Sequence, residues 1–162
     1  METLENKMMV PHSGNIVPGA GTRSGKSVEL PAEVCARRVL IMDDDATTRM
    51  VVSLIIAQEG LRSVEAENGE EAIAAYKYAR ASGDPFDAVL LDLTIRGGMG
   101  GRETLQALTT IDPAVRAVVI SGNTLDPAFA RFREFGFRNA LPKPFSGEAL
   151  MDVLRGVLTA SP

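Results

Sequence analysis

The chain has 162 residues, 45% of them apolar, which is enough for one domain with a hydrophobic core. Its net charge of −4 argues against nucleic acid as the main partner, and its single cysteine and single histidine exclude an internal disulfide and a histidine or cysteine metal cluster. No apolar run approaches the roughly 20 residues that span a bilayer, and the start shows no signal peptide. We therefore expect a cytoplasmic protein that is not in a membrane.

Residues 1–37 are expected to form a flexible N-terminal extension, because glycine and proline gather there without sustained periodicity. The segment GAGTRSGKS (19–27) matches a phosphate-binding loop if Ala20 is accepted as its first position. Such a loop needs a strand before it and a helix after it. HSGNIVPG is a poor strand, and Pro31 would end a following helix almost at once, so we predict no nucleotide binding.

From Val39 onward, short apolar runs alternate with amphipathic stretches. In chain order the predicted elements are a strand at 39–42, a helix at 47–60, a strand at 62–66, a helix at 68–83, a strand at 87–92, a helix at 101–111, a strand at 116–121, a helix at 126–136, a strand at 138–142 and a helix at 146–158. Asn68, Pro127 and Ser146 are expected near the starts of their helices. Five strands alternating with five helices predict an α/β domain over 38–160, with a parallel sheet covered on both faces.

Polar residues stand where four of these strands end. The first strand runs into Asp43, Asp44 and Asp45, the third ends in Asp92, the fourth ends in Ser121, and the fifth is followed by Lys143. One such aspartate alone is most often a turn former or a helix cap. Because the carboxyl ends of parallel strands share one edge of the sheet, the whole set instead indicates a functional site.

The chemistry of this set points to phosphoryl transfer. Carboxylates that converge in one crevice repel each other unless a cation lies between them, and oxygen ligands suit Mg²⁺. A carboxylate beside Mg²⁺ can attack phosphorus and form an aspartyl phosphate. A lysine ammonium and a serine hydroxyl could each bind an oxygen of the transferred group.

The runs VLIMDDD, AVLLD, VVIS and LPKPF are similar to the motifs of the receiver domain of bacterial two-component response regulators, the CheY-like family. The resemblance covers about 39–159. It implies a flavodoxin-like, doubly wound, five-stranded parallel sheet in the order 2-1-3-4-5. It also implies that Asp92 accepts a phosphoryl group from a histidine kinase or a phosphotransfer protein in a phosphorelay.

The resemblance further implies the roles of the neighbouring residues. Asp44 would bind Mg²⁺ directly, Asp43 mainly through water, and Thr94 through its backbone carbonyl. Lys143 and Ser121 would contact the phosphoryl group. Asp45 would lie outside the metal's ligands. Activity beyond Mg²⁺-dependent self-phosphorylation and self-dephosphorylation is not expected, so the chain would not be an enzyme in the ordinary sense.

Finer features refine the comparison. DLTIRGGMGG (92–101) resembles the C-terminal receivers of hybrid sensor kinases, except that Arg96 stands where proline is usual. Ala140 replaces an aromatic residue found in many receivers, which weakens the expected coupling of phosphorylation to output. Residues 14–33 faintly resemble the end of a histidine-kinase ATPase domain, so the extension could be a kinase remnant.

The output is expected to run through a partner. Only the four residues TASP follow the last predicted helix, so we expect no fused DNA-binding domain. A downstream protein would use the face of the last two strands and helices, around four phenylalanines at 129, 132, 135 and 137, of which we expect at least two to face the core.

One alternative comes from another class. Asp43-x-Asp45-x-Thr47 matches the DxDx[TV] signature of haloacid-dehalogenase-type phosphatases, with Ser121 and Lys143 in supporting roles. Those enzymes also need an acidic pair at a strand end after the lysine, and the chain has acids there only within its final helix. The two readings differ in whether Asp92 or Asp43 is phosphorylated.

Overall fold

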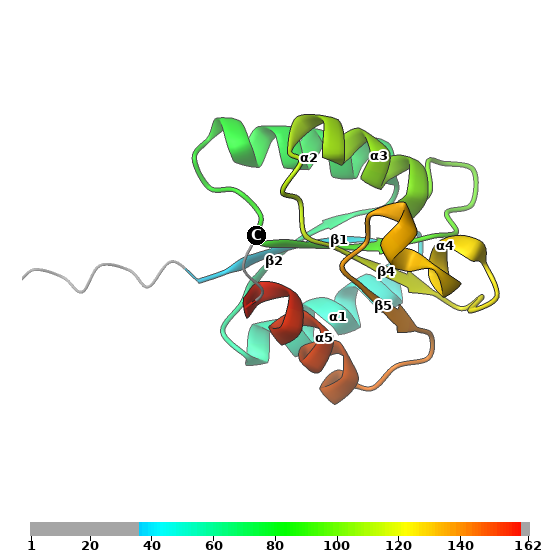
Figure 1. Cartoon of the computed structure of the whole chain (residues 1–162). Coiled ribbons are helices and arrows are strands. Elements are labelled where there is room, and N and C mark those ends of the chain that lie inside the picture. Colours follow the sequence, from blue (N-terminus) through cyan, green and yellow to red (C-terminus); the bar gives the residue numbers. More distant parts are fainter. Residues whose placement is uncertain (1–35, 160–162) are drawn as a thin grey trace, which may run out of the picture. The chain divides into compact units, whose positions relative to one another are not determined.

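The computed structural model of the protein describes residues 36–159 (Figure 1). Of the predicted extension at 1–37, residues 1–35, with the phosphate-loop-like segment and the kinase remnant, lie outside the described residues, and Arg37 donates a hydrogen bond to the Leu158 carbonyl. Among residues 36–159, no helix is both long and apolar enough to cross a membrane.

The centre of the domain is a five-stranded sheet in which every neighbouring pair is parallel. Its strands are β1 (Arg38–Met42), β2 (Arg62–Ala66), β3 (Ala88–Asp92), β4 (Ala117–Ser121) and β5 (Asn139–Pro142). The strand order is β2-β1-β3-β4-β5, which confirms the predicted flavodoxin-like topology. β1, β3 and β4 occupy the middle, and their apolar runs are buried on both faces, as expected for central parallel strands.

Helices cover both faces of the sheet. They are α1 (Ala46–Gln58), α2 (Gly69–Ala81), α3 (Gly101–Ile111), α4 (Pro127–Ala130) and α5 (Gly147–Thr159). Figure 1 shows α1 and α5 on one face and α2 and α3 on the other. Two apolar cores result, one under each helical layer, and alternate residues of the central strands supply both of them.

The helix starts follow the sequence signals. Asn68 caps α2, because its side-chain oxygen accepts a hydrogen bond from the Glu71 N–H. The Ser146 hydroxyl accepts a hydrogen bond from the Ala149 N–H at the start of α5. Pro127 occupies the first turn of α4, where its missing N–H costs nothing. All three predictions are confirmed.

The helix predicted at 126–136 is the main correction to the expected elements. The structure has the short helix α4, then a 3₁₀ helix, η1 (Phe132–Phe135), separated from it at Arg131. The aromatic residues at 129, 132 and 135 repeat every three positions, which is the period of a 3₁₀ helix rather than of an α-helix. All three are partly buried against the core under α2 and α3, and Phe137 is fully buried there. The expectation that at least two phenylalanines face the core is therefore confirmed.

Candidate functional site

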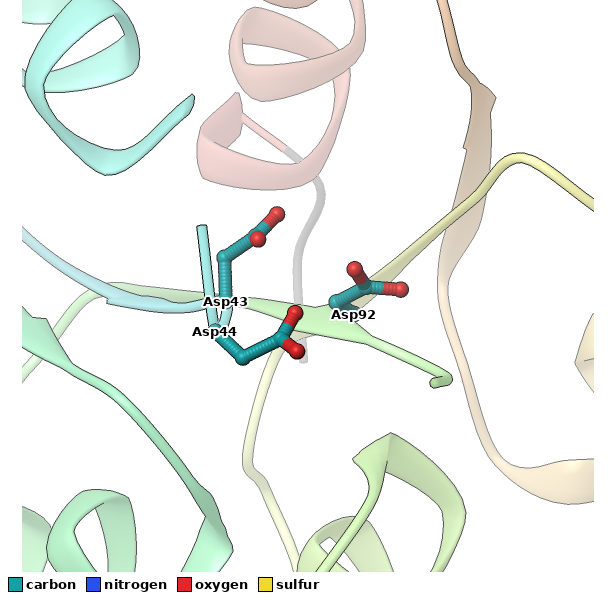
Figure 2. A group of neighbouring side chains, drawn as sticks. All are labelled: Asp43, Asp44 and Asp92. Atoms are coloured by element: carbon teal, nitrogen blue, oxygen red, sulfur yellow. The ribbon is translucent and has the colours of Figure 1, made fainter. Parts of the chain in front are cut away.

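Three carboxylates meet at the carboxyl ends of β1 and β3, which are neighbours in the sheet. Asp43 and Asp44 directly follow β1, and Asp92 is the last residue of β3. One carboxylate oxygen from each lies within 4.8 Å of the others, and Figure 2 shows the three side chains gathered at this edge. Asp43 is 2% exposed and Asp92 is 6% exposed, whereas the Asp44 side chain is 27% exposed. The structure thus brings together the three acids that the sequence singled out.

Lys143, which directly follows β5, brings a positive charge to this cluster. Its Nζ lies 2.6 Å from Asp43 Oδ2 and 2.6 Å from Asp92 Oδ2, so one ammonium group bridges two buried carboxylates. Burial by itself would lower the pKa of Lys143, but its hydrogen bonds to Asp43 and Asp92 outweigh burial and leave the pKa above its ordinary value. The lysine is therefore fully charged at neutral pH.

The position of Asp92 changes its protonation. Burial raises its pKa, and this effect exceeds the opposing effects of the Lys143 ammonium and the Thr94 N–H. That N–H donates a hydrogen bond to Asp92 Oδ1 at 3.1 Å, so Thr94 lies beside the cluster, while the predicted role of its carbonyl as a metal ligand stays a prediction. A carboxylate held in a dry site by two donors has a fixed orientation, which a nucleophile requires.

Ser121 and Asp45 are placed differently from the three clustered acids. Ser121 is buried at the end of β4, beside β3, and its hydroxyl accepts a hydrogen bond from the Asn123 N–H at 3.0 Å. Asp45 is exposed and caps α1, because it accepts hydrogen bonds from the Thr47 N–H and the Thr48 hydroxyl. These bonds lower the pKa of Asp45, the Thr48 hydroxyl most of all. The position of Asp45 outside the acidic cluster disfavours the phosphatase alternative, which needs it beside Asp43.

Arg49 is a structural support that sequence reasoning missed. It is only 7% exposed, and its guanidinium donates a hydrogen bond of 2.6 Å to the Asp43 carbonyl. It also donates to Glu67 Oε1 at 3.1 Å, and its Nε forms an ion pair of 3.4 Å with Glu65 Oε2. Arg49 therefore ties the end of β1 to β2. The signal was its spacing of three and seven residues from buried Val52 and Ile56, which places an arginine on the inward face of α1.

The loop from β3 to α3 packs directly on the cluster. A Cβ at Gly101 would lie 2.7 Å from the Asp92 carbonyl oxygen, so α3 can begin this close to Asp92 only with glycine there. Earlier in the loop, Arg96 contacts Asp44 twice. Its N–H lies 3.3 Å from Asp44 Oδ2, and its guanidinium Nε lies 3.7 Å from the same oxygen. Sequence reasoning noted Arg96 only as a missing proline.

An apolar hollow of about 400 Å³ opens beside Lys143, between the start of α1 and the segment after β5. It is lined by Thr47, Thr48, Val51, Val52, Lys143, Pro144 and Phe145. Next to it, α1 exposes three large apolar side chains, Met50, Val51 and Leu54, which we call the α1 apolar patch. An exposed apolar surface that borders a charged site is typical of a protein-binding surface.

The donor atoms of the cluster fit a magnesium ion. The three acids offer oxygen ligands only, and oxygen is the ligand that Mg²⁺ prefers. Among the described residues, Lys143 contacts only Asp43 and Asp92, and Asp44 has only the solvent-exposed Arg96 guanidinium at 3.7 Å, so the three carboxylates retain negative charge that a divalent cation would offset. Chemically, the arrangement can present a carboxylate nucleophile to an electrophile whose negative charge a cation and Lys143 would stabilise.

Comparisons with known proteins agree with this geometry. The model of the family described as "Response regulator receiver domain" matches residues 39–155. The chain is 30% identical over 122 residues to the chemotaxis protein CheY of Thermotoga maritima, covering 75% of this chain and 97% of the relative. It is 36% identical over 117 residues to a response regulator receiver protein of Anaeromyxobacter, covering 72% of this chain but only 47% of that longer protein.

Solved structures show the same architecture. The chemotaxis protein CheY4 of Vibrio cholerae superposes with a TM-score of 0.68 at 26% identity, covering 76% of this chain and 99% of that chain. A structure described as the CheX-CheY-BeF3-Mg+2 complex from Borrelia burgdorferi superposes with a TM-score of 0.69 at 26% identity, covering 76% and 90% of the two chains.

Proposed function

The chain belongs to the family of response regulator receiver domains of two-component phosphorelays, and we propose that it accepts a phosphoryl group on Asp92 from a histidine kinase or a phosphotransfer protein. The observation that carries this proposal is the position of Asp92. Its buried carboxylate ends β3, lies beside the Asp43 and Asp44 pair, and contacts the Lys143 ammonium. Among the described residues, this is the group of acids placed close enough together to hold a metal ion.

In the proposed transfer, an Asp92 carboxylate oxygen attacks the phosphorus of a phosphohistidine. The new O–P bond forms as the P–N bond breaks, and the donor imidazole leaves and takes up a proton. Lys143 then releases the carboxylate oxygen and binds an oxygen of the phosphoryl group, while the Ser121 hydroxyl turns from Asn123 to bind another. Water later attacks the phosphorus, which breaks the O–P bond, releases inorganic phosphate and returns the Asp92 carboxylate. Self-phosphorylation and self-dephosphorylation are therefore the proposed activities.

We propose Mg²⁺ as the cofactor of this site. Asp44 and Asp92 would hold it, supported by Asp43 and the Thr94 carbonyl. When bound, the ion supplies positive charge to the transferred group. The Borrelia burgdorferi relative, whose structure is described with BeF3 and Mg+2, supports this assignment by likeness.

The α1 apolar patch is proposed as the surface on which the phosphoryl donor protein docks. The hollow beside it shares Val51 with the patch and reaches Lys143, which contacts Asp92. A partner seated on the patch would therefore hold its phosphohistidine close to the acceptor.

Four further points are separate proposals. A downstream partner would bind at the face of β4, β5, α4 and α5, and the receiver would have no fused DNA-binding output. The protein would be cytoplasmic and would originate among the receivers of hybrid kinases.

The test is to incubate the full chain with acetyl phosphate or a candidate kinase and Mg²⁺, and then to locate the added phosphoryl group by mass spectrometry. We expect one phosphoryl group on Asp92 and none in Asp92→Asn. Asp152→Asn, which removes an exposed carboxylate on α5, is the matched control and should be phosphorylated like the wild type. Phosphorylation that survives in Asp92→Asn would refute the proposal, and a label on Asp43 would favour the phosphatase alternative.

A further inference from the structure

The negative charge of the acidic cluster is partly offset from two directions by cations of the chain itself. Lys143 bridges Asp43 and Asp92 at 2.6 Å each. The third acid, Asp44, is contacted by the backbone N–H and the guanidinium of Arg96, which lies in the loop between β3 and α3. Each of the three carboxylates thus has a cationic side chain close by.

The two cations are held in very different ways. The Lys143 side chain is 24% exposed and makes two short hydrogen bonds. The Arg96 side chain is 92% exposed and lies 3.7 Å from Asp44, so its ion pair is loose and open to solvent. The next residue, Gly97, has a φ of 73°, and a side chain built there would meet nothing within 4 Å. The guanidinium can therefore leave Asp44 without disturbing a packed surface.

We propose that Arg96 is an internal competitor of the divalent cation at Asp44. This inference rests on the proposed Mg²⁺ site. Asp44 is the most exposed of the three acids and the one that Lys143 does not contact, so an incoming ion must take it from Arg96. A positive charge at that position lowers the affinity of the site for Mg²⁺, because it occupies the Asp44 carboxylate and repels the incoming ion. Arg96 thereby sets the magnesium concentration at which the site fills.

The test is calorimetric titration of the full, unphosphorylated chain with MgCl₂ at low salt. We expect Arg96→Gln to bind Mg²⁺ about threefold more tightly than the wild type, the size of effect that an exposed ion pair can have. Arg96→Lys, which keeps the charge, should stay close to the wild type. At 0.5 M KCl the difference should shrink, because salt screens an exposed charge.

The control for net charge is Arg155→Gln. Arg155 lies on α5, is 55% exposed, and pairs with Asp152 and with Glu59 beyond the far end of α1. We expect its Mg²⁺ affinity to match the wild type. Equal tightening in Arg155→Gln would refute the proposal, because the effect would then come from net charge alone. Unchanged or weaker binding in Arg96→Gln would refute it as well. If the wild type binds no Mg²⁺ at millimolar levels, the proposed metal site itself fails.

Discussion

At the scale of single residues, Lys143 is the residue on which the metal-free site depends most. Its ammonium group contacts two carboxylates that are each more than nine-tenths buried. Removing one member of a buried ion pair leaves a charge that neither water nor protein compensates. Here the removal would leave two such charges, with a third carboxylate beside them.

We expect Lys143→Ala to destabilise the metal-free protein by about 3 kcal/mol at pH 7. Burial raises the pKa of Asp92 and Lys143 lowers it, so without the lysine this pKa rises further. A carboxyl whose pKa is raised by folding binds a proton more readily in the folded state, and its contribution to stability is lost as the pH rises through that pKa. The destabilisation should therefore be smaller at pH 4.5 than at pH 7.

Urea unfolding of the variant and the wild type in EDTA, at both pH values, measures this difference. Lys77→Ala, which removes an exposed lysine from α2, is the control and should change little at either pH. An equal loss at both pH values in Lys143→Ala would contradict the argument, since uncompensated carboxylates must respond to protonation. Mg²⁺ should still bind the variant, because Lys143 is not a metal ligand in the proposed site.

The sequence predicted that the acids and Lys143 would lie together, since each stands at the carboxyl end of a strand and parallel strands align those ends. It did not predict how Arg49 and Arg96 serve the site. Arg49 acts on a backbone carbonyl, and Arg96 depends on the path of a glycine-rich loop. The spacing of Arg49 places it on the inward face of α1, but neither contact can be predicted from the sequence, because both exist only once the loop and strand geometry are set.

At the scale of elements, the strands and long helices agree with prediction to within about two residues, whereas α4 does not. The long elements have an apolar period that only one secondary structure satisfies. The 126–136 segment has aromatic residues every third position, and packing all of them on one core face favours a short helix followed by a 3₁₀ turn. Tertiary packing there outweighed local helix signals.

The α1 helix yields a prediction about the partner. Leu54 is 58% exposed in the α1 apolar patch, so replacing it with aspartate should leave the fold intact. We expect Leu54→Asp to reduce phosphotransfer from a protein donor about tenfold, because a charge in a buried contact is costly. Transfer from acetyl phosphate should be unchanged, since that small donor needs no docking surface.

Initial rates with both donors, followed by mass spectrometry of Asp92, measure the effect. Tyr78→Asp is the matched control, because Tyr78 is 73% exposed on α2, at the other helical layer. It should behave like the wild type with either donor. A Leu54→Asp variant that loses both reactions equally would indicate damage to the site, and one that loses neither would remove α1 from the docking surface.

At the scale of the whole molecule, the start of β1 determines where the domain begins. The Arg38 guanidinium donates a hydrogen bond to the Asp84 carbonyl and lies 4.5 Å from the centre of the Phe86 ring. The Arg38 backbone N–H donates a hydrogen bond to the Asp87 carboxylate. Arg37 donates to the Leu158 carbonyl at the end of α5. These contacts tie the start of the first strand to the loop between α2 and β3 and to the end of α5, one residue or more before the family match at 39–155.

Two truncated proteins test this boundary. A chain that begins at Ala36 keeps every one of these contacts, and we expect its melting temperature and its Asp92 phosphorylation to match those of the full chain. A chain that begins at Val39 loses Arg37 and Arg38. It should lose about 2 kcal/mol of stability, a fall of roughly 6 °C in melting temperature. Its phosphorylation should persist, because neither arginine contacts the acidic cluster in the structure.

The same pair of proteins decides whether residues 1–35 contribute to the domain. Their sequence is rich in glycine and proline and has little apolar periodicity, so we expect them to add little to stability and to bind no nucleotide. Thermal melts of both truncations and the full chain, with an ATP titration of the full chain and of Lys26→Ala, measure both points. A sharp fall in melting temperature on truncation to Ala36 would show that the extension packs on the receiver. Micromolar ATP binding that Lys26→Ala abolishes would show that GAGTRSGKS forms a working phosphate loop, because the lysine of such a loop contacts the bound phosphates directly.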